Sequence, residues 1–282
     1  VYATSYPTRG EPTAVSEAYA RFLKARVALN TQDDESAERL LLEAVRLDPE
    51  FGEAWELLAH VYWNDSLPDL SLAEMQRRMG DAAARALAID PELALARALL
   101  YEGQPDPYTW ADAIDAGVAA LRLQPNDPVT LRMLSWNLVI TGYLDEGRRV
   151  AARFAEIDPL TWIAHVRHAA ALIGVGRRES AAIEFAIARE LNPGGEMDWF
   201  LGAVLLGLGE DEKAIDWMQS GARDLLLTDV AWVREIVAGA RRAGNDPAFL
   251  DQAIPRVLAG MTPEQVDVWQ HHLNRLYLYL GL

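Results

Sequence analysis

The feature that most constrains the fold of this chain is a repeat of 34 residues marked by prolines. Within one period, Gly176 interrupts a helical pattern and Phe185 lies on the helix that follows. A fixed period with small, large and helix-breaking residues in register indicates an array of helical hairpins, each too small to bury its apolar face alone. The prolines that set the interval are Pro91, Pro125, Pro159 and Pro193.

We therefore predict an all-α solenoid, a right-handed superhelix of antiparallel helix pairs. Residues 1–11 are expected to form an irregular lead-in, and 12–282 a single solenoid of six to seven hairpins that ends in a capping helix. An atypical last unit is needed to cover the final apolar face. The predicted repeats lie near 14–49, 51–91, 92–125, 127–159, 161–193 and 195–227, with a degenerate repeat at 229–260 and the cap at 262–282.

Two departures from the period stand out. Pro49 and Pro91 are 42 residues apart, which is eight more than the period, and the extra residues fall within 64–70. An insertion that preserves the flanking register lies on a loop, where function is often grafted, although a tolerated surface insertion is the alternative. Pro105 and Pro107 fall inside the next expected helix, which should therefore end near Glu102.

Side-chain size alternates in a way that suits close helix packing. Small residues are expected where the two helices of a hairpin cross, and large residues should fill the space against the next hairpin. The small positions are Ala59, Ser135, Ala169 and Gly202, and the large positions are Leu41, Phe154 and Phe185.

The charge balance limits the partners. The formal net charge is −16, with 42 acidic side chains against 26 Lys and Arg. Such a surface repels phosphate backbones and anionic membrane surfaces, so we expect no nucleic-acid partner. No apolar run reaches the roughly 18–20 residues of a transmembrane helix, so we expect no direct membrane insertion of this segment. There are no cysteines, so disulfides and thiolate chemistry are excluded. We expect a cytoplasmic chain, or a periplasmic one if a membrane segment precedes it.

The string Trp55-x-x-Leu58-Ala59-x-x-Tyr62 resembles the first helix of a tetratricopeptide repeat (TPR), and the resemblance covers roughly residues 14–260. More specifically, the opening EAYARFLKARVALN…ESAERLLLEAVRLDPEFGEAWELLAHVYW is similar to the C-terminal TPR region of certain bacterial signalling proteins. Those proteins place a winged-helix DNA-binding domain or an adenylate-cyclase-type domain ahead of the repeats. The resemblance implies a sensory or regulatory interaction module and a fragment of a longer protein.

The TPR resemblance also predicts a concave binding groove. Aromatic side chains on a concave, partly polar surface can anchor a peptide or a small ligand. The alternative is that these aromatic residues pack against neighbouring helices. The carboxylate clamp of chaperone-binding TPR groups is not reproduced at the matching positions. The predicted groove residues are Glu56, His60, Trp63, Arg132, Trp136, Arg167 and Trp199.

No catalytic, cofactor or metal motif stands out. His165 and His168 share one helical face and could form a metal pair, but no third ligand is visible nearby in the sequence, and two packing positions are the alternative. A glycine-rich stretch before Lys213 lacks the ending of a phosphate-binding loop. We predict no enzyme activity, no cofactor and no metal.

The sequence thus predicts a non-enzymatic module that binds a protein or peptide, with a basic or apolar partner favoured by the negative charge. A first alternative is an oligomerisation or scaffold module, with a homodimer formed through 262–282, where leucines recur on the last helix. A second alternative is a small-molecule or enzymatic groove lined by Trp63, Trp136 and Trp199.

Overall fold

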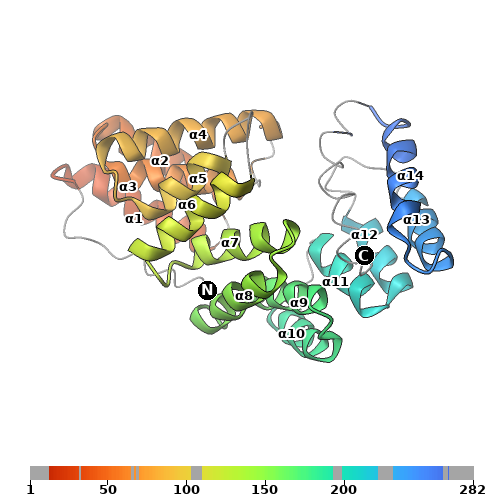
Figure 1. Ribbon diagram of the computed structural model, residues 1–282. Helices are drawn as coiled ribbons and strands as arrows, with labels where there is room; N and C mark the ends of the chain where they lie inside the picture. Colours follow the sequence, from red (N-terminus) through yellow and green to blue (C-terminus); the bar gives the residue numbers. More distant parts are fainter. Residues whose placement is uncertain are drawn as a thin grey trace. The chain divides into compact units, whose positions relative to one another are not determined.

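A computed structural model shows an all-α chain. It describes residues 13–31, 33–64, 67, 70–102, 110–192, 199–221, 231–262 and 266, and within these ranges it contains fourteen α-helices and no β-strand (Figure 1). None of these helices is long and apolar enough to cross a membrane. The helices are α1 (Ser16–Asn30), α2 (Asp34–Leu47), α3 (Gly52–Trp63), α4 (Leu72–Ile89), α5 (Ala94–Glu102), α6 (Trp110–Leu123), α7 (Pro128–Ile140), α8 (Leu144–Ile157), α9 (Trp162–Gly174), α10 (Arg178–Leu191), α11 (Trp199–Leu208), α12 (Asp211–Gly221), α13 (Ala231–Arg242) and α14 (Pro247–Leu258).

The chain divides into two compact units, Val1–Asn137 and Leu138–Leu282. In the first unit, α1 packs against α2, α3 against α4, and α5 against α6, while α3 also contacts α2 and α5. In the second unit, α9 packs against α10, α11 against α12, and α13 against α14. The predicted all-α array of helical hairpins is therefore confirmed. One continuous solenoid over 12–282 stays a prediction, because the lead-in and nearly all of the cap lie outside the described residues.

Glycine forms the turn between the two helices of a hairpin. After α9, Gly176 has φ +74°, in the left-handed region that other residues rarely adopt. The Gly176 N–H donates to the Ile173 carbonyl at 2.9 Å, and the Arg177 N–H donates to the Leu172 carbonyl at 2.8 Å. These two bonds form a Schellman motif, which satisfies the last carbonyls of the helix and turns the chain toward α10.

The two departures from the sequence period, the insertion near Asn64 and the prolines after Glu102, fall in the turn before α4 and at the end of α5. The Ser71 side chain caps α4 by accepting a hydrogen bond from the Glu74 N–H at 3.2 Å, so the long turn ends at that point. Of the inserted stretch, Asn64, Leu67 and Leu70 are described, and Leu67 is buried. Helix α5 ends at Glu102, as predicted, and the two prolines after it lie outside the described residues.

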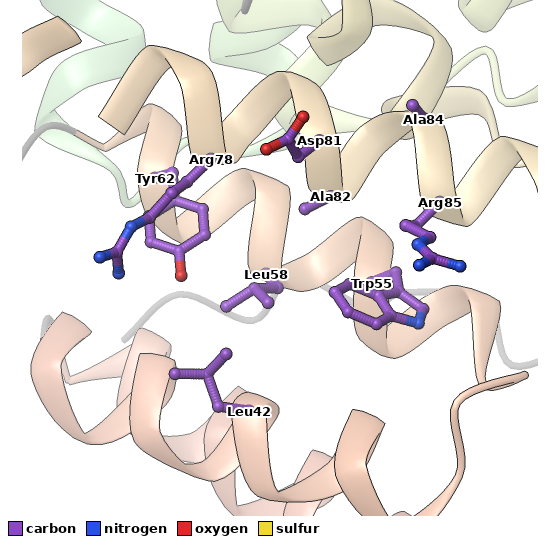
Figure 2. A pocket seen from close by; sticks show the side chains of 9 residues that line it. All are labelled: Leu42, Trp55, Leu58, Tyr62, Arg78, Asp81, Ala82, Ala84 and Arg85. Carbon is purple, nitrogen blue, oxygen red and sulfur yellow. The ribbon is translucent and has the colours of Figure 1, made fainter. Parts of the chain in front are cut away.

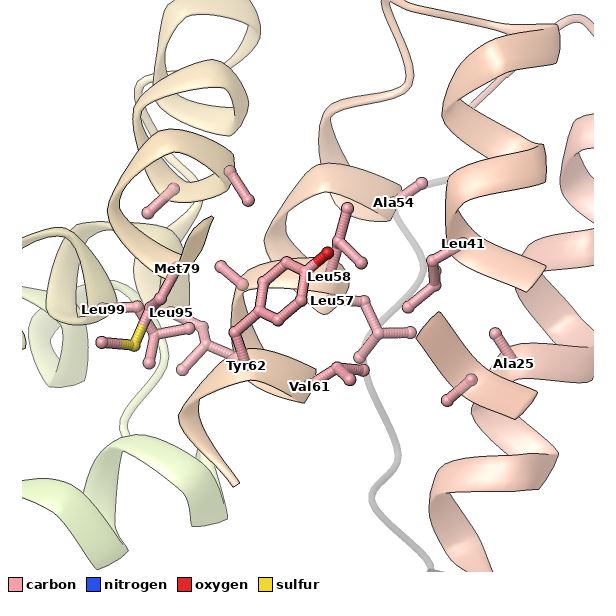
Figure 3. Packing of buried hydrophobic residues seen from close by; sticks show 14 of the residues in the cluster. Ala25, Leu41, Ala54, Leu57, Leu58, Val61, Tyr62, Met79, Leu95 and Leu99 are labelled. Atoms are coloured by element: carbon pink, nitrogen blue, oxygen red, sulfur yellow. The ribbon is translucent and has the colours of Figure 1, made fainter. Parts of the chain in front are cut away.

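The core of the first unit runs through successive hairpins rather than around one centre. Figure 3 shows side chains from α1 to α5 packing side by side. Fully burying one leucine contributes about 1.5–3 kcal/mol, so this shared core stabilises neighbouring hairpins together. The predicted small and large packing positions are all buried, namely Ala59, Ser135, Ala169, Gly202, Leu41, Phe154 and Phe185.

Candidate functional site

Helix α3 carries three of the predicted groove residues on one side. Glu56, His60 and Trp63 follow at intervals of four and three residues, which places them on the same face of a helix. Every residue from Glu56 to Tyr62 is buried, whereas Trp63 and Asn64 at the end of the helix are half-buried. The accessible part of this face is therefore the C-terminal end of α3.

Glu56 binds the beginning of the next repeat. Its carboxyl Oε1 accepts a hydrogen bond from the Ala96 N–H at 3.0 Å, and Ala96 lies in the first turn of α5. The Glu56 side chain thus caps the N-terminus of α5, where backbone N–H groups lack partners within the helix. Burial, with a smaller effect from the nearby carboxyl of Asp127, raises the pKa of Glu56 to about 8. The contact with α5 therefore accounts for the burial of Glu56 between the two helices.

His60 and Trp63 form a corner with Arg132 from α7. The His60 and Trp63 ring centroids are 6.1 Å apart, and the Arg132 guanidinium carbon lies 4.1 Å from the Trp63 ring centroid. The latter contact is a cation–π interaction. Burial, together with the positive charge of Arg132, lowers the pKa of His60 to about 3, so the imidazole is neutral at pH 7.

A chain of hydrogen bonds extends this corner to α2. Arg132 Nη2 donates to Asn64 Oδ1 at 3.1 Å, and Asn64 Nδ2 donates to Asp34 Oδ1 at 3.3 Å. Residues from α2, α3 and α7 therefore converge on one point. We call His60, Trp63, Asn64 and Arg132 the Trp63 corner. Asn64 and Asp34 were not among the predicted groove residues, although Asn64 is the first residue of the inserted stretch.

The other predicted groove residues are placed differently. Trp136 lies one turn after Arg132 on α7 and is buried, with 8% of its surface exposed. Arg167 is half-buried on α9 in the second unit. Trp199 begins α11, and its side chain lies outside the described residues. The structure brings His60, Trp63 and Arg132 together, whereas Glu56 contacts α5. A ligand-binding role for all seven residues stays a prediction.

A second concave feature lies on the other side of α3 and was not predicted. It is a groove of about 650 Å³ between α2 and α4, with α3 as its floor (Figure 2). We call it the α2–α4 groove. The sequence pattern does not reveal this groove, because its width depends on how the second helices of two successive hairpins pack. Its lining residues are Leu42, Trp55, Leu58, Tyr62, Arg78, Asp81, Ala82, Ala84 and Arg85.

The histidine pair of α9 shares a carboxylate from α10. His165 Nδ1 lies 2.7 Å from Glu184 Oε2, and His168 Nδ1 lies 3.0 Å from Glu184 Oε1. The other ring nitrogen of His165 lies 3.0 Å from the Pro159 carbonyl oxygen. Because both nitrogens of His165 face acceptors, the imidazolium form suits this position. Among the residues described, no group of three or more His, Cys, Asp or Glu could hold a metal ion.

Three solved structures match most of the chain. TTC0263, a thermophilic TPR protein of Thermus thermophilus, has 16% sequence identity and a TM-score of 0.50, covering 74% of this chain and 100% of its own. PilW, a type IV pilus biogenesis factor, has 15% identity and a TM-score of 0.51, covering 75% of this chain and 95% of its own. PilF of Pseudomonas aeruginosa has 14% identity and a TM-score of 0.51, covering 79% of this chain and 97% of its own.

At these low identities, the likeness to the solved structures concerns the fold alone. The shared fold is an all-α TPR solenoid, which fits the helix arrangement described above. No family model matches the sequence, and no curated protein is similar to it in sequence.

Proposed function

We propose that this chain is a non-enzymatic TPR module that binds a protein or peptide at the Trp63 corner. The observation that carries the proposal is the convergence of a half-buried tryptophan and an asparagine at the end of α3 with an arginine from α7. Interfaces are enriched in Trp and Arg, and such residues supply much of the binding energy. The fold adds support, because arrays of this kind present extended surfaces for partners.

The shape of the corner favours binding with little rearrangement. Arg132 is held by Trp63 and Asn64, so its guanidinium does not need to be ordered when a partner arrives. Ordering a long side chain costs about 0.5–1.5 kcal/mol at an interface, and that cost is reduced here. His60, whose ring lies beside that of Trp63, is neutral and adds no charge that a partner would have to compensate.

The partner we propose is basic or apolar. The net charge of −16 attracts a basic segment over distances of several ångströms, and salt screens this attraction. We further propose that the module is the sensory or regulatory part of a larger bacterial signalling protein, on the strength of the similarity of the opening repeats to that class.

A selection from a random-peptide library on the immobilised chain tests the binding function. We expect the enriched peptides to carry Lys or Arg beside apolar residues, and their affinity to fall as salt concentration rises. In fluorescence-polarisation titrations, Trp63→Ala and Arg132→Gln should each weaken such a peptide about tenfold or more.

The matched control is Trp110→Ala, since Trp110 is also in the first unit and is 39% exposed. It should leave the affinity unchanged. Circular dichroism on each variant establishes that the helices are retained. If the peptides bind the Trp63 and Arg132 variants as tightly as the unaltered chain, the Trp63 corner is not the binding surface.

A further inference from the structure

The α2–α4 groove offers apolar surface that the chain itself leaves uncovered. Leu42 at its edge is 43% exposed, whereas Leu58 on its floor is 2% exposed. Trp55 contributes a half-buried indole beside them (Figure 2). A volume of about 650 Å³ lies within the range of sites that bind small ligands or a few peptide side chains. The groove therefore has room for one or two apolar side chains of a partner.

The aromatic walls are already fixed in place. Trp55 Nε1 donates to the Pro49 carbonyl at 3.0 Å, and the Tyr62 hydroxyl donates to Glu38 Oε1 at 2.9 Å. Since these polar groups are bonded within the chain, the rings present mainly apolar surface to an occupant. Fixed aromatic walls lose little conformational entropy on binding.

The charged side chains along the α4 wall indicate which charge a partner should carry. Arg78 is paired with Glu74 and Glu38, and Asp81 is paired with Arg77 at 2.7 Å. Arg85, two turns after Arg78, is exposed and makes no ion pair within the described part of the chain. The groove thus combines an apolar floor with one cation that has no paired counter-charge among the residues described.

We propose that the α2–α4 groove is a second docking surface, which binds a peptide segment with an apolar anchor residue and a carboxylate that pairs with Arg85. The apolar anchor, leucine or aromatic, lies against Leu42, Trp55 and Leu58. Ala82 and Ala84 on the α4 wall have short side chains, so the backbone of the segment can approach α4 closely.

This surface is separate from the Trp63 corner. Tyr62 lines the groove, whereas the adjacent residue Trp63 contacts Arg132 of α7. Consecutive residues of a helix point in different directions, so the two surfaces lie on different sides of α3. They also differ in charge preference, with a basic partner at the corner and a single carboxylate at the groove.

Two selections from one random-peptide library test the proposal. The library is first depleted on a chain carrying Leu42→Glu and Arg85→Glu, and the remaining peptides are then selected on the unaltered chain. Both replaced side chains are at least partly exposed, so the double variant should keep its helices in circular dichroism. We expect the selected peptides to share an apolar residue and an Asp or Glu at fixed spacing.

Titrations with one selected peptide then assign the contacts. Arg85→Gln should weaken binding about tenfold or more, because a charge-assisted hydrogen bond is lost, and Arg85→Lys should restore part of the affinity. Leu42→Glu should weaken binding by a similar factor. Trp63→Ala and Arg132→Gln should have no effect on this peptide, so a failure here is distinguishable from a failure at the Trp63 corner.

A matched control is Arg149→Gln, an exposed arginine of the second unit. The proposal is overturned if no peptide depends on the groove. It is also overturned if the groove-dependent peptides carry Lys or Arg in place of the carboxylate, or if Arg85→Gln binds as tightly as the unaltered chain.

Discussion

Single ionisable residues between neighbouring helices tie the stability of this array to pH. Glu56 is a buried acid whose pKa is raised from 4.5 to about 8, whereas Glu184 is a partly buried acid whose pKa is lowered from 4.5 to about 2. The difference has a structural cause, since burial dominates at Glu56 and hydrogen bonds from two histidines dominate at Glu184. The two carboxyls therefore change stability in opposite directions as pH rises.

Replacing Glu56 by glutamine should stabilise the chain at alkaline pH. An acid with a raised pKa in the folded state destabilises it as pH rises from 4.5 through about 8, and glutamine keeps an acceptor for the Ala96 N–H without the charge. Urea unfolding should show Glu56→Gln equal to the unaltered chain near pH 4.5 and more stable by about 1 kcal/mol or more at pH 8. Glu56→Ala should instead lose about 1–3 kcal/mol near pH 4.5, because the Ala96 N–H loses its partner, and should lose less at pH 8, where the unaltered chain is itself destabilised by the buried charge.

The His165–Glu184 pair should contribute most to the free energy of unfolding between pH 4.5 and 6.5. The carboxylate of Glu184 and the Pro159 carbonyl raise the pKa of His165 above 6.5, so its contribution is complete below 6.5 and is lost as pH rises through the raised value. The Glu184 contribution is complete above 4.5 and is lost as pH falls through about 2.

We expect His165→Gln to lower the free energy of unfolding by about 1–3 kcal/mol at pH 6 and by less at pH 9. Glu156→Gln, at an exposed surface pair, serves as the control and should leave the pH profile unchanged. Equal losses for His165→Gln at pH 6 and pH 9 would contradict a charged His165.

At the scale of helical elements, the turn after α9 depends on the backbone of Gly176. A Cβ atom at this position would meet nothing within 4 Å, so only the left-handed backbone conformation opposes substitution. Gly176→Ala should therefore cost about 1–2 kcal/mol in unfolding experiments. Gly176→Asn should cost less and Gly176→Val more, since asparagine tolerates this conformation and branched residues do not. Equal effects for all three would show that the turn relaxes to another shape.

Contacts between hairpins depend on the large residue of each second helix. Phe185 on α10 has 6% of its surface exposed, so Phe185→Ala should leave a cavity and cost about 3–5 kcal/mol. Ile183 lies two residues earlier on the same helix and is 63% exposed, so Ile183→Ala should change stability by less than about 0.5 kcal/mol. Thermal and urea unfolding of the two variants measure this difference. A small loss for Phe185→Ala would mean that neighbouring helices collapse into the space.

At the scale of the whole molecule, the repeat period was enough to predict the helices. The residues that start, turn and end each hairpin lie close together in the sequence, so the period reveals them. The glycine turn at Gly176, the early end of α5 at Glu102 and the burial of Ala59 and Phe185 all follow from register within one repeat. The polar contacts depend instead on how separate helices pack. Glu184 is 19 residues from His165, and Arg132 is 68 residues from Asn64, so neither pairing is visible in the sequence pattern.

Only part of the Trp63 corner was predicted, because the contacts within it also join helices that are far apart in the sequence. The TPR register placed Trp63, His60 and Arg132 among the candidate residues, and they lie together. It did not show that Glu56 caps α5, because that contact joins two successive repeats. The α2–α4 groove escaped prediction altogether, since its floor residues Leu58 and Trp55 look like ordinary packing positions in a repeat.

The most direct test of the account is an NMR titration of the isotope-labelled chain with a basic peptide selected on it. We expect the indole N–H of Trp63, assigned with Trp63→Phe, and the Arg132 side-chain resonances to shift in a saturable way, with smaller effects at Trp110. Peptide binding that leaves both Trp63 and Arg132 unshifted, or that shifts only resonances of the second unit, would contradict a binding surface at the Trp63 corner.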